Sequence, residues 1–326
     1  MFAQFIHRRS LIAGAVLSLA AACLAAQDFP SKPVRLVVGF PPGGGADGAA
    51  RAVAQKLNEV WGQPVVVDNR AGAGGNVAAD IVAHAVADGH TLLITSPGPL
   101  VINPVLYGNL PYDAQKDFAP ITLIAAGANV LVVHPSVSAN STHELMALAR
   151  SKAGGLNYAS SGIGTIPHLS GELFRIAAKL PLTNIVYKGA GAAVIDLVAG
   201  RVDLMLVSVP SVLTQIRAKR LRALAVTTLK RAAALPELPT LDESGVPGYE
   251  SIAWWGVLAP AGTPRAVVTT LNKTIVKSLN AADTRERLAT EGAEVAGNTP
   301  AEFDVFLKRE VKKWTGVIRT AGIRVE

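Results

Sequence analysis

Short apolar runs alternate with stretches in which apolar residues recur every three or four positions, from residue 34 to residue 258. A continuous apolar run bounded by turn residues is typical of a buried strand, and the wider spacing is typical of an amphipathic helix. Strands are predicted at 34–40, 65–68, 91–95, 156–160, 184–187, 202–207, 222–227 and 252–258. Strands that alternate with helices in this way indicate an α/β fold with parallel strands.

The last part of the chain has a helical pattern from residue 264 onward and is preceded by a single strand. One strand is too little for a separate domain, so we expect this tail to pack back onto the first sheet. The second α/β unit is then an insertion, with chain crossings near 124–130 and 249–258. We predict a first lobe from 27–126 and 251–326, a second lobe from 127–250, and a ligand cleft between the two lobes.

Residues 1–26 have the layout of a secretory signal peptide rather than of a folded element. Arg8 and Arg9 precede an uncharged, mainly apolar run at 11–22, and small residues follow up to Ala26. The run is shorter than the roughly 20 apolar residues of a membrane-spanning helix. We therefore expect cleavage near Ala25 or Ala26 and a periplasmic location for the mature protein.

The amino-acid composition excludes several classes of function. The 326 residues are 50% hydrophobic and 17% charged, which is typical of a folded chain. Removing residues 1–26 lowers the net charge from +7 to +5 and removes Cys23, the only cysteine. Thiol catalysis, cysteine-bound zinc and disulfides are then excluded. Basic residues lie in short clusters without interleaved aromatic residues, so we expect no nucleic-acid partner.

The turn at 40–48, with the sequence FPPGGGADG, follows a strand and opens a helix. Glycines allow tight folding and expose backbone N–H groups, and a helix N-terminus is partially positive. The turn therefore predicts an anion cradle, with Phe40, Gly44, Gly45 and Asp47 as candidate ligand-binding residues. For the Asp47 carboxylate we favour a helix cap over a general base.

The same turn admits an alternative interpretation. Gly43, Gly45 and Gly48 match the pattern G-x-G-x-x-G, and Asp68 lies 20 residues further on, as in a dinucleotide site. The protein would then be an exported α/β enzyme that uses a nucleotide. Two prolines stiffen the turn, and an aspartate within it would face the pyrophosphate, so we favour the anion cradle. Asp68 should lie at the cleft in the enzyme and away from the ligand in a binding protein.

Other turns that follow predicted strands carry small, hydroxyl or basic residues. Turns of this kind from both lobes should converge on one cleft. Thr165 either binds there or simply caps the helix that follows it. The candidate ligand-binding residues in these turns are Ser96, Gly98, Ser160, Ser161, Gly164, Thr165, His168, Tyr187, Lys188 and Gly189.

No catalytic constellation is found in the sequence. It contains neither a G-x-S-x-G nor an H-E-x-x-H motif, and the histidines beyond residue 26 lack the spacing of metal ligands. We therefore predict binding without turnover, no cofactor and no metal.

Eight stretches together resemble the Bug-type extracytoplasmic solute receptors, also called tripartite tricarboxylate transporter substrate-binding proteins. The resemblance implies a two-lobed periplasmic-binding-protein-like fold of type II that closes on a small organic carboxylate. It also implies delivery of this ligand to membrane transporter subunits or to a sensor, and we expect a monomer. The stretches are 30–47, 68–76, 87–93, 116–125, 156–174, 187–193, 221–227 and 254–264.

The chain departs from the family pattern at the end of one strand. Many relatives carry an aspartate there, which pairs with an amino group of the ligand, and this chain carries Ser208. Ser208 is therefore a further candidate binding residue, and a dicarboxylate or aromatic carboxylate is expected rather than an amino acid. Val186 and His90 also differ from the residues common in the family, which affects ligand identity more than fold.

Overall fold

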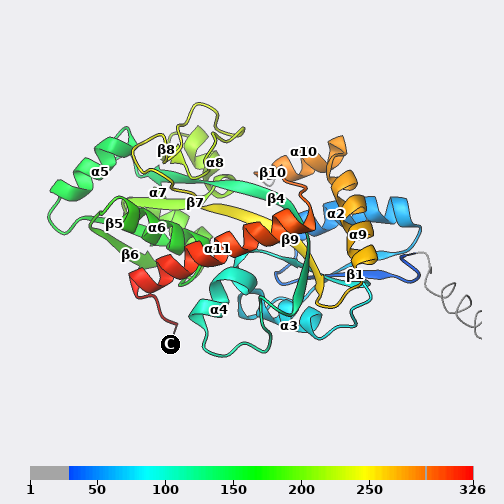
Figure 1. The fold of residues 1–326 in the computed structure, drawn as a ribbon. Helices are drawn as coiled ribbons and strands as arrows, with labels where there is room; N and C mark the ends of the chain where they lie inside the picture. Colours follow the sequence, from blue (N-terminus) through cyan, green and yellow to red (C-terminus); the bar gives the residue numbers. More distant parts are fainter. Residues whose placement is uncertain (1–28, 291, 326) are drawn as a thin grey trace, which may run out of the picture.

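A computed structural model describes residues 29–290 and 292–325 (Figure 1). The predicted signal peptide and Cys23 lie outside the described residues. Within them, ten strands form one continuous curled sheet with helices on both faces. The fold is therefore α/β, as the alternation of apolar patterns predicts, but not all strands are parallel, because β4 is antiparallel to β9, β7 and β8.

The first half of the sheet has the strand order β2-β1-β3-β9-β4, with the short β10 at the other edge of β4. Its strands are β1 (Val34–Val38), β2 (Val65–Asn69), β3 (Thr91–Thr95), β4 (Phe118–Val133), β9 (Ile252–Pro260) and β10 (Ala293–Val295). The helical elements around it are α2 (Gly45–Trp61), η1 (Ala73–Gly75), α3 (Asn76–Ala83), η2 (Gly98–Ile102), α4 (Asn103–Leu106), α9 (Arg265–Leu279), α10 (Ala282–Thr290) and α11 (Pro300–Ala321).

The second half continues from β4 in the order β4-β7-β5-β6, with β8 also paired to β4. Its own strands are β5 (Leu156–Ser160), β6 (Leu182–Val186), β7 (Leu204–Ser208) and β8 (Arg222–Val226). Its helices are α5 (Thr142–Ser151), α6 (Ile166–Ala177), α7 (Ala190–Val198) and α8 (Val209–Arg217).

Strand β4 is shared by the two halves. Its residues 118–128 pair with β9, and residues 129–133 pair with β7 and β8. The chain thus passes from one half to the other at Ala128 and Asn129, and it returns where β9 begins. The sequence pattern predicts a crossing here but no strand, because Gly127 and Asn129 are weak strand formers within an otherwise apolar run.

Successive residues of each strand face opposite sides of the sheet and enter different cores. In the first half, Leu36 packs with α2 and α9, and its neighbour Val37 packs with α3 and α11. In the second half, Leu206 packs with α5 and α6, and Val207 packs with α7 and α8. Each half is therefore a sheet between two helical layers.

The C-terminal helices behave differently from one another. Helices α9 and α10 pack against α2 in the first half, as the sequence analysis expects. Helix α11 instead runs lengthwise over the molecule and contacts β4 and η2 as well as α6 of the second half (Figure 1). The last helix therefore bridges the two halves.

Candidate functional site

The strand directions bring two groups of turns toward each other. Strands β1, β2 and β3 are parallel, and β9 is antiparallel to both β3 and β4, so these three strands run in the direction of β4. Strand β7 is antiparallel to β4 and parallel to β5, which is parallel to β6. The carboxyl ends of β1–β3 therefore point toward the second half, and those of β5–β7 point toward the first.

The register of β4 gives the spacing of these two groups. The end of β3, at Thr95, lies level with Gly256 and, through it, with Leu123 of β4. The end of β7, at Ser208, pairs with Asn129. Six residues of β4 separate the two levels, which is about 20 Å at about 3.3 Å per residue. A small organic anion between the turns is compatible with this separation.

The glycine turn after β1 lies at the N-terminus of α2, which begins at Gly45 rather than near Ala50, where the apolar periodicity starts. Gly44 is the N-cap, and no side chain hydrogen-bonds to the first N–H groups of the helix. A Cβ on Gly44 would meet only the Pro41 carbonyl oxygen, at 3.9 Å, whereas a Cβ on Gly45 would collide with the Trp255 ring. Gly44 thus lies in open space, and Gly45 is required for packing.

Asp47 braces this turn. It is 3% exposed, and its carboxylate accepts hydrogen bonds from the Gly43 N–H at 3.0 Å, Arg51 Nε at 2.9 Å and Asn69 Nδ2 at 3.0 Å. Burial alone would raise the pKa of Asp47, but the hydrogen bonds from Arg51, Gly43 and Asn69 outweigh it and lower the pKa. Asp47 lies in the first turn of α2, so it is not the N-cap favoured from the sequence.

The other first-half turns pack closely on the same region. A Cβ on Gly75, in the turn after β2, would lie 2.7 Å from Pro99 Cγ and 3.3 Å from Phe40 Cζ. A Cβ on Gly98 would lie 3.0 Å from the carbonyl oxygen of Gly74. The structure therefore brings Phe40 and Gly98 together through the 72–75 turn, which the sequence analysis did not include among the candidates.

A buried polar cluster holds these turns in place. The Asn76 side-chain oxygen accepts hydrogen bonds from Asn103 Nδ2 at 2.6 Å and from the Tyr112 hydroxyl at 2.8 Å. The Tyr112 hydroxyl also lies 2.8 Å from the Pro99 carbonyl oxygen. The candidate Ser96, at the end of β3, is half-buried, and its carbonyl oxygen accepts a hydrogen bond from the Thr95 hydroxyl at 3.3 Å.

In the second half, the loop between β5 and α6 is held by its own side chains. Thr165 occupies the N-cap position of α6, but its hydroxyl donates to the Gly162 carbonyl oxygen at 2.7 Å and accepts from Ser161 Oγ at 3.2 Å. No side-chain cap reaches the first N–H groups of α6. His168 Nδ1 accepts the Gly164 N–H at 3.1 Å.

His168 is therefore a support for the loop. His168 is 6% exposed, and burial lowers the pKa of its imidazole, with a smaller opposing effect of Glu172. The neutral ring keeps Nδ1 available as an acceptor for Gly164. His168 is a candidate ligand-binding residue by sequence, whereas in the structure its Nδ1 contacts the Gly164 N–H of its own loop.

The turn between β6 and α7 joins the same surface. The Tyr187 N–H donates to the Ser160 carbonyl oxygen at 2.9 Å, and the Gly189 N–H donates to the Ser161 carbonyl oxygen at 3.2 Å. Gly189 is the N-cap of α7, without a side-chain cap, and a Cβ there would meet nothing within 4 Å. These bonds align the turns after β5 and β6 side by side.

The remaining candidates differ in what they contact. The Tyr187 hydroxyl donates to Asp196 Oδ2 at 3.0 Å within the second half, and Lys188 is exposed. Ser160 Oγ is buried without a hydrogen-bond partner among the described residues. Ser208 Oγ, at the end of β7, lies 2.8 Å from Ser211 Oγ.

Two contacts between the halves were not accessible from the sequence. A Cβ on Gly164 would collide with Leu106 Cδ1, so the α6 loop lies directly against α4 of the first half. At the crossing, Asn129 Nδ2 donates to the Ser251 carbonyl oxygen at 3.1 Å, and the Thr227 hydroxyl donates to the same oxygen at 2.5 Å. This buried network ties both crossing segments together.

Asp68 does not fit the dinucleotide alternative. Its carboxylate is paired with Arg35, at 2.6 Å from Nε, and with Arg70, at 3.0 Å from Nε. Burial alone would raise the pKa of Asp68, but these two arginines outweigh it and lower the pKa. An acid already occupied by two arginines is not free to bind ribose hydroxyls.

Residues 29–290 and 292–325 include no helix that is long and apolar enough to cross a membrane. No group of three or more histidine, aspartate or glutamate side chains among them could hold a metal ion.

Sequence comparison matches residues 49–323 to the model of the tripartite tricarboxylate transporter family receptors. A UPF0065 protein from the tcbD-tcbE intergenic region of Pseudomonas sp. strain P51 is 44% identical, over 96% of this chain and 94% of the relative. Protein BugT of Bordetella pertussis is 36% identical, over 94% of each chain.

Structure comparison gives the same family. Rpa4515 of Rhodopseudomonas palustris, solved with adipate, is 40% identical with a TM-score of 0.78, over 91% of this chain and 99% of the other. MatC from Rhodopseudomonas palustris, with bound malate, is 32% identical with a TM-score of 0.73, over 89% and 100%. The periplasmic binding protein BugD is 35% identical with a TM-score of 0.73, over 91% and 100%.

Proposed function

The chain belongs to the tripartite tricarboxylate transporter receptor family, and on this premise we propose that it is a periplasmic receptor for a small dicarboxylate. The observation that carries the proposal is the set of uncapped helix N-termini at the facing turns. Helices α2, α6 and α7 each begin without a side-chain hydrogen bond to their first N–H groups. Such N–H groups bind carboxylates well, because they donate hydrogen bonds at the positive end of the helix dipole.

The proposed contacts come from both halves. In the first half they are Gly44, Gly45, Ser96 and Gly98, with Phe40 against the ligand and Asp47 as a brace. In the second half they are Ser160, Ser161, Gly164, Thr165, Tyr187, Lys188, Gly189 and Ser208, with His168 as a brace. The two halves correspond to lobes at 27–126 with 251–326 and at 127–250, which would close on the ligand by movement at the β4 and β9 crossing.

A dicarboxylate is the favoured ligand class. The relatives Rpa4515 and MatC were solved with adipate and malate, which are both dicarboxylates. Ser208, at the end of β7, offers a hydroxyl rather than a carboxylate, so a ligand amino group would lack a counter-charge there. Each hydrogen bond to a charged group contributes about 1.5–3 kcal/mol, so four or five are sufficient for a micromolar affinity, about −8 kcal/mol, after the losses on association.

The cellular setting follows from the same premise. The receptor would be exported by residues 1–26, act in the periplasm as a monomer, and deliver its ligand to membrane transporter subunits or to a sensor. No cofactor, metal or nucleic acid takes part. Intact-mass analysis of the exported protein should give a chain that begins near Ala26 or Gln27, and retention of Met1 would contradict the proposed export.

Calorimetric titration with matched ligands tests the proposed function. Adipate should bind with a micromolar Kd, and its diamide should bind at least tenfold more weakly, because it lacks the carboxylate charge. Succinate should bind more tightly than aspartate, because Ser208 cannot pair with the amino group. Equal binding of the acids and amides would refute the anion cradle, and NADH binding at the same site would favour the enzyme alternative. Adipate recovered unchanged after long incubation supports binding without turnover.

A further inference from the structure

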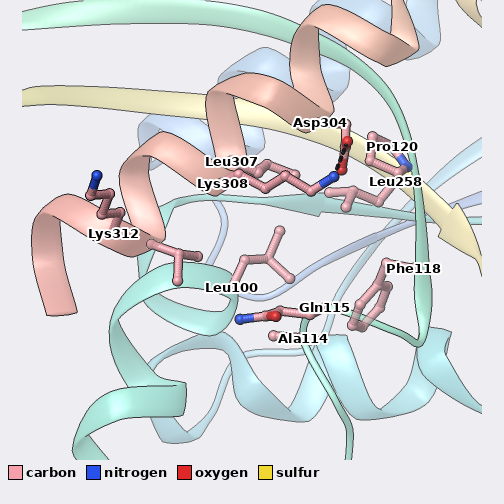
Figure 2. Close-up of a pocket in the computed structure, with 11 residues that line it drawn as sticks. Leu100, Ala114, Gln115, Phe118, Pro120, Leu258, Asp304, Leu307, Lys308 and Lys312 are labelled. Carbon is pink, nitrogen blue, oxygen red and sulfur yellow. Dashed lines mark hydrogen bonds and ion pairs between the residues drawn. The ribbon is translucent and has the colours of Figure 1, made fainter.

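A groove away from the facing turns runs along one side of α11. It consists of two adjoining cavities, of about 330 and 570 Å³, which share Leu100, Gln115 and Val311. Figure 2 shows the first cavity, with Leu307 on the α11 side and Leu100, Ala114 and Phe118 on the opposite side. The two cavities therefore form one continuous groove between α11 and the segments around η2 and α4.

One wall is a single stripe of α11. Its members recur every three or four residues over about four turns, so they share one face of the helix. From Asp304 to Gly322 the stripe is about 27 Å long, at about 1.5 Å per residue. The members are Asp304, Leu307, Lys308, Val311, Lys312, Thr315, Ile318 and Arg319, followed by the C-cap residue Gly322.

The opposite wall is largely apolar. It is made by η2, α4, the segment before β4 and the first residues of β4, and Gln115 is the one polar side chain among its described members. Its other members are Leu100, Val101, Pro104, Val105, Ala114, Phe118 and Pro120. Apolar side chains therefore line this wall in both cavities, and polar surface takes a larger share in the second cavity.

The rim of the groove is positively charged. Lys308, Lys312, Arg319 and Arg324 line it, and Asp304 is the one carboxylate among the described lining residues. Asp304 is neutralised by Lys308, whose Nζ lies 2.6 Å from Oδ2. Lys312, Arg319 and Arg324 are exposed, and none of them pairs with another described residue. Three cations without a partner among the described residues therefore flank the apolar side chains of the groove.

We propose that this groove binds an amphipathic acidic helix of a partner protein. An elongated groove lined by apolar side chains suits a helix that inserts apolar residues spaced three and four apart, and the cations on the rim select carboxylates beside them. The groove is several times longer than a small dicarboxylate. The apolar residues are recessed rather than protruding, which favours a helix in the groove over a membrane surface. The inference goes beyond solute binding and does not depend on it.

A designed peptide is the direct probe. An 18-residue helix with a leucine stripe flanked by glutamates carries a fluorescent label, and its matched partner has lysines in place of the glutamates. Fluorescence anisotropy with the full mature protein should give at least tenfold tighter binding of the glutamate peptide. The double variant Lys312→Glu/Arg319→Glu should bind it at least tenfold more weakly. The control Lys273→Glu/Lys277→Glu changes the charge equally at exposed positions of α9 and should bind like the unsubstituted protein.

Equal binding of both peptides would overturn the proposal, and so would equal effects of both double variants. A third contrary outcome is that Lys312→Glu/Arg319→Glu loses binding to phosphatidylglycerol vesicles but still binds the glutamate peptide like the unsubstituted protein. The last result would assign the cations to a membrane surface. Adipate titration of the same samples keeps the two proposals separate. A protein that binds the glutamate peptide but not adipate supports the groove and counts against the proposed solute site.

Discussion

The Trp255 ring lies directly against Gly45, so that a Cβ on this glycine would collide with the indole. Gly44, the preceding residue, lies in open space, and a Cβ there would meet only the Pro41 carbonyl oxygen at 3.9 Å. The two adjacent glycines are therefore needed for different reasons. Gly45 lets α2 pack on β9, and Gly44 leaves the backbone at the helix N-terminus accessible.

Substitution of Gly45 should affect stability first. Gly45→Ala forces the Trp255 ring to move, and overpacking of this kind lowers the free energy of unfolding by about 1–3 kcal/mol. Urea unfolding followed by tryptophan fluorescence measures the change. Unaltered stability would show that the indole shifts freely and that the contact does not constrain α2.

Substitution of Gly44 should instead affect adipate binding. The φ of Gly44 is −90°, which any residue adopts, so Gly44→Ala should lower the free energy of unfolding by no more than the cost of alanine at an N-cap, about 1 kcal/mol. Its methyl group would obstruct the approach of a carboxylate to the α2 N–H groups, and we expect at least a tenfold weaker Kd, about 1.4 kcal/mol. Gly316→Ala is the control, because a Cβ there meets nothing within 4 Å and Gly316 lies outside the proposed site. Equal adipate affinity in the two variants would move the ligand away from Gly44.

Much of the sheet could be predicted because its strands are continuous apolar runs between turns. The expected bounds of β3 and β5 agree with the structure at both ends. Strand β10 was missed because its three residues become a strand only through pairing with β4, where Ala293 lies opposite Gly127. Pairing between residues so far apart in sequence leaves no local pattern.

The same distinction between local patterns and contacts with distant residues applies to the candidate site. Glycine and hydroxyl turns after strands are local features, so their positions could be predicted. Which partner each side chain contacts depends on residues far away in the sequence. One example is the hydrogen bond from Asn69 to Asp47, which joins two different turns. The contact of Gly164 with Leu106 likewise joins segments from the two halves. Whether a residue binds ligand or braces a loop therefore needed the structure.

Asp47 should contribute to stability as a carboxylate. Asp47→Asn replaces one acceptor oxygen by a donor facing Gly43, Arg51 and Asn69, and we expect a loss of about 1.5–3 kcal/mol at pH 7. Because the folded protein has the lower pKa, the contribution of Asp47 is present above the unfolded value near 4 and is lost as the pH falls below it. The variant should therefore show a weaker loss of stability between pH 5 and the acid limit.

The exposed pair of Asp304 and Lys308 provides the control for this experiment. Asp304→Asn also removes a carboxylate from an (i, i+4) ion pair, but solvent screens that pair, and its contribution is about 0.3–0.5 kcal/mol. Denaturant unfolding at pH 7 and pH 4 compares the two variants. Similar losses for Asp47→Asn and Asp304→Asn would mean that the buried network at the glycine turn adds no stability.

His168 should make the free energy of unfolding depend on pH at higher pH values than Asp47 does. Burial lowers the pKa of its imidazole in the folded protein, whereas an unfolded histidine titrates near 6.5. As the pH falls below about 6.5, the unfolded chain takes up a proton that folded His168 does not, so the free energy of unfolding decreases. His168→Asn removes the titration and keeps an acceptor oxygen for the Gly164 N–H.

Two variants separate the titration of His168 from its hydrogen bond. Against urea at pH 7.5, His168→Asn should be close to the unsubstituted protein, whereas His168→Ala should lose at least about 1–3 kcal/mol, because the Gly164 N–H is left without an acceptor. Between pH 7.5 and 5.5, both variants should lose less stability than the unsubstituted protein, because neither carries the imidazole. An unchanged pH dependence in both would show that folded His168 takes up its proton over the same pH range as an unfolded histidine, so that the Gly164 N–H does not hold the ring in its neutral form. The loop would in that case be held by Thr165 alone, and His168 would again be free to face an anionic ligand.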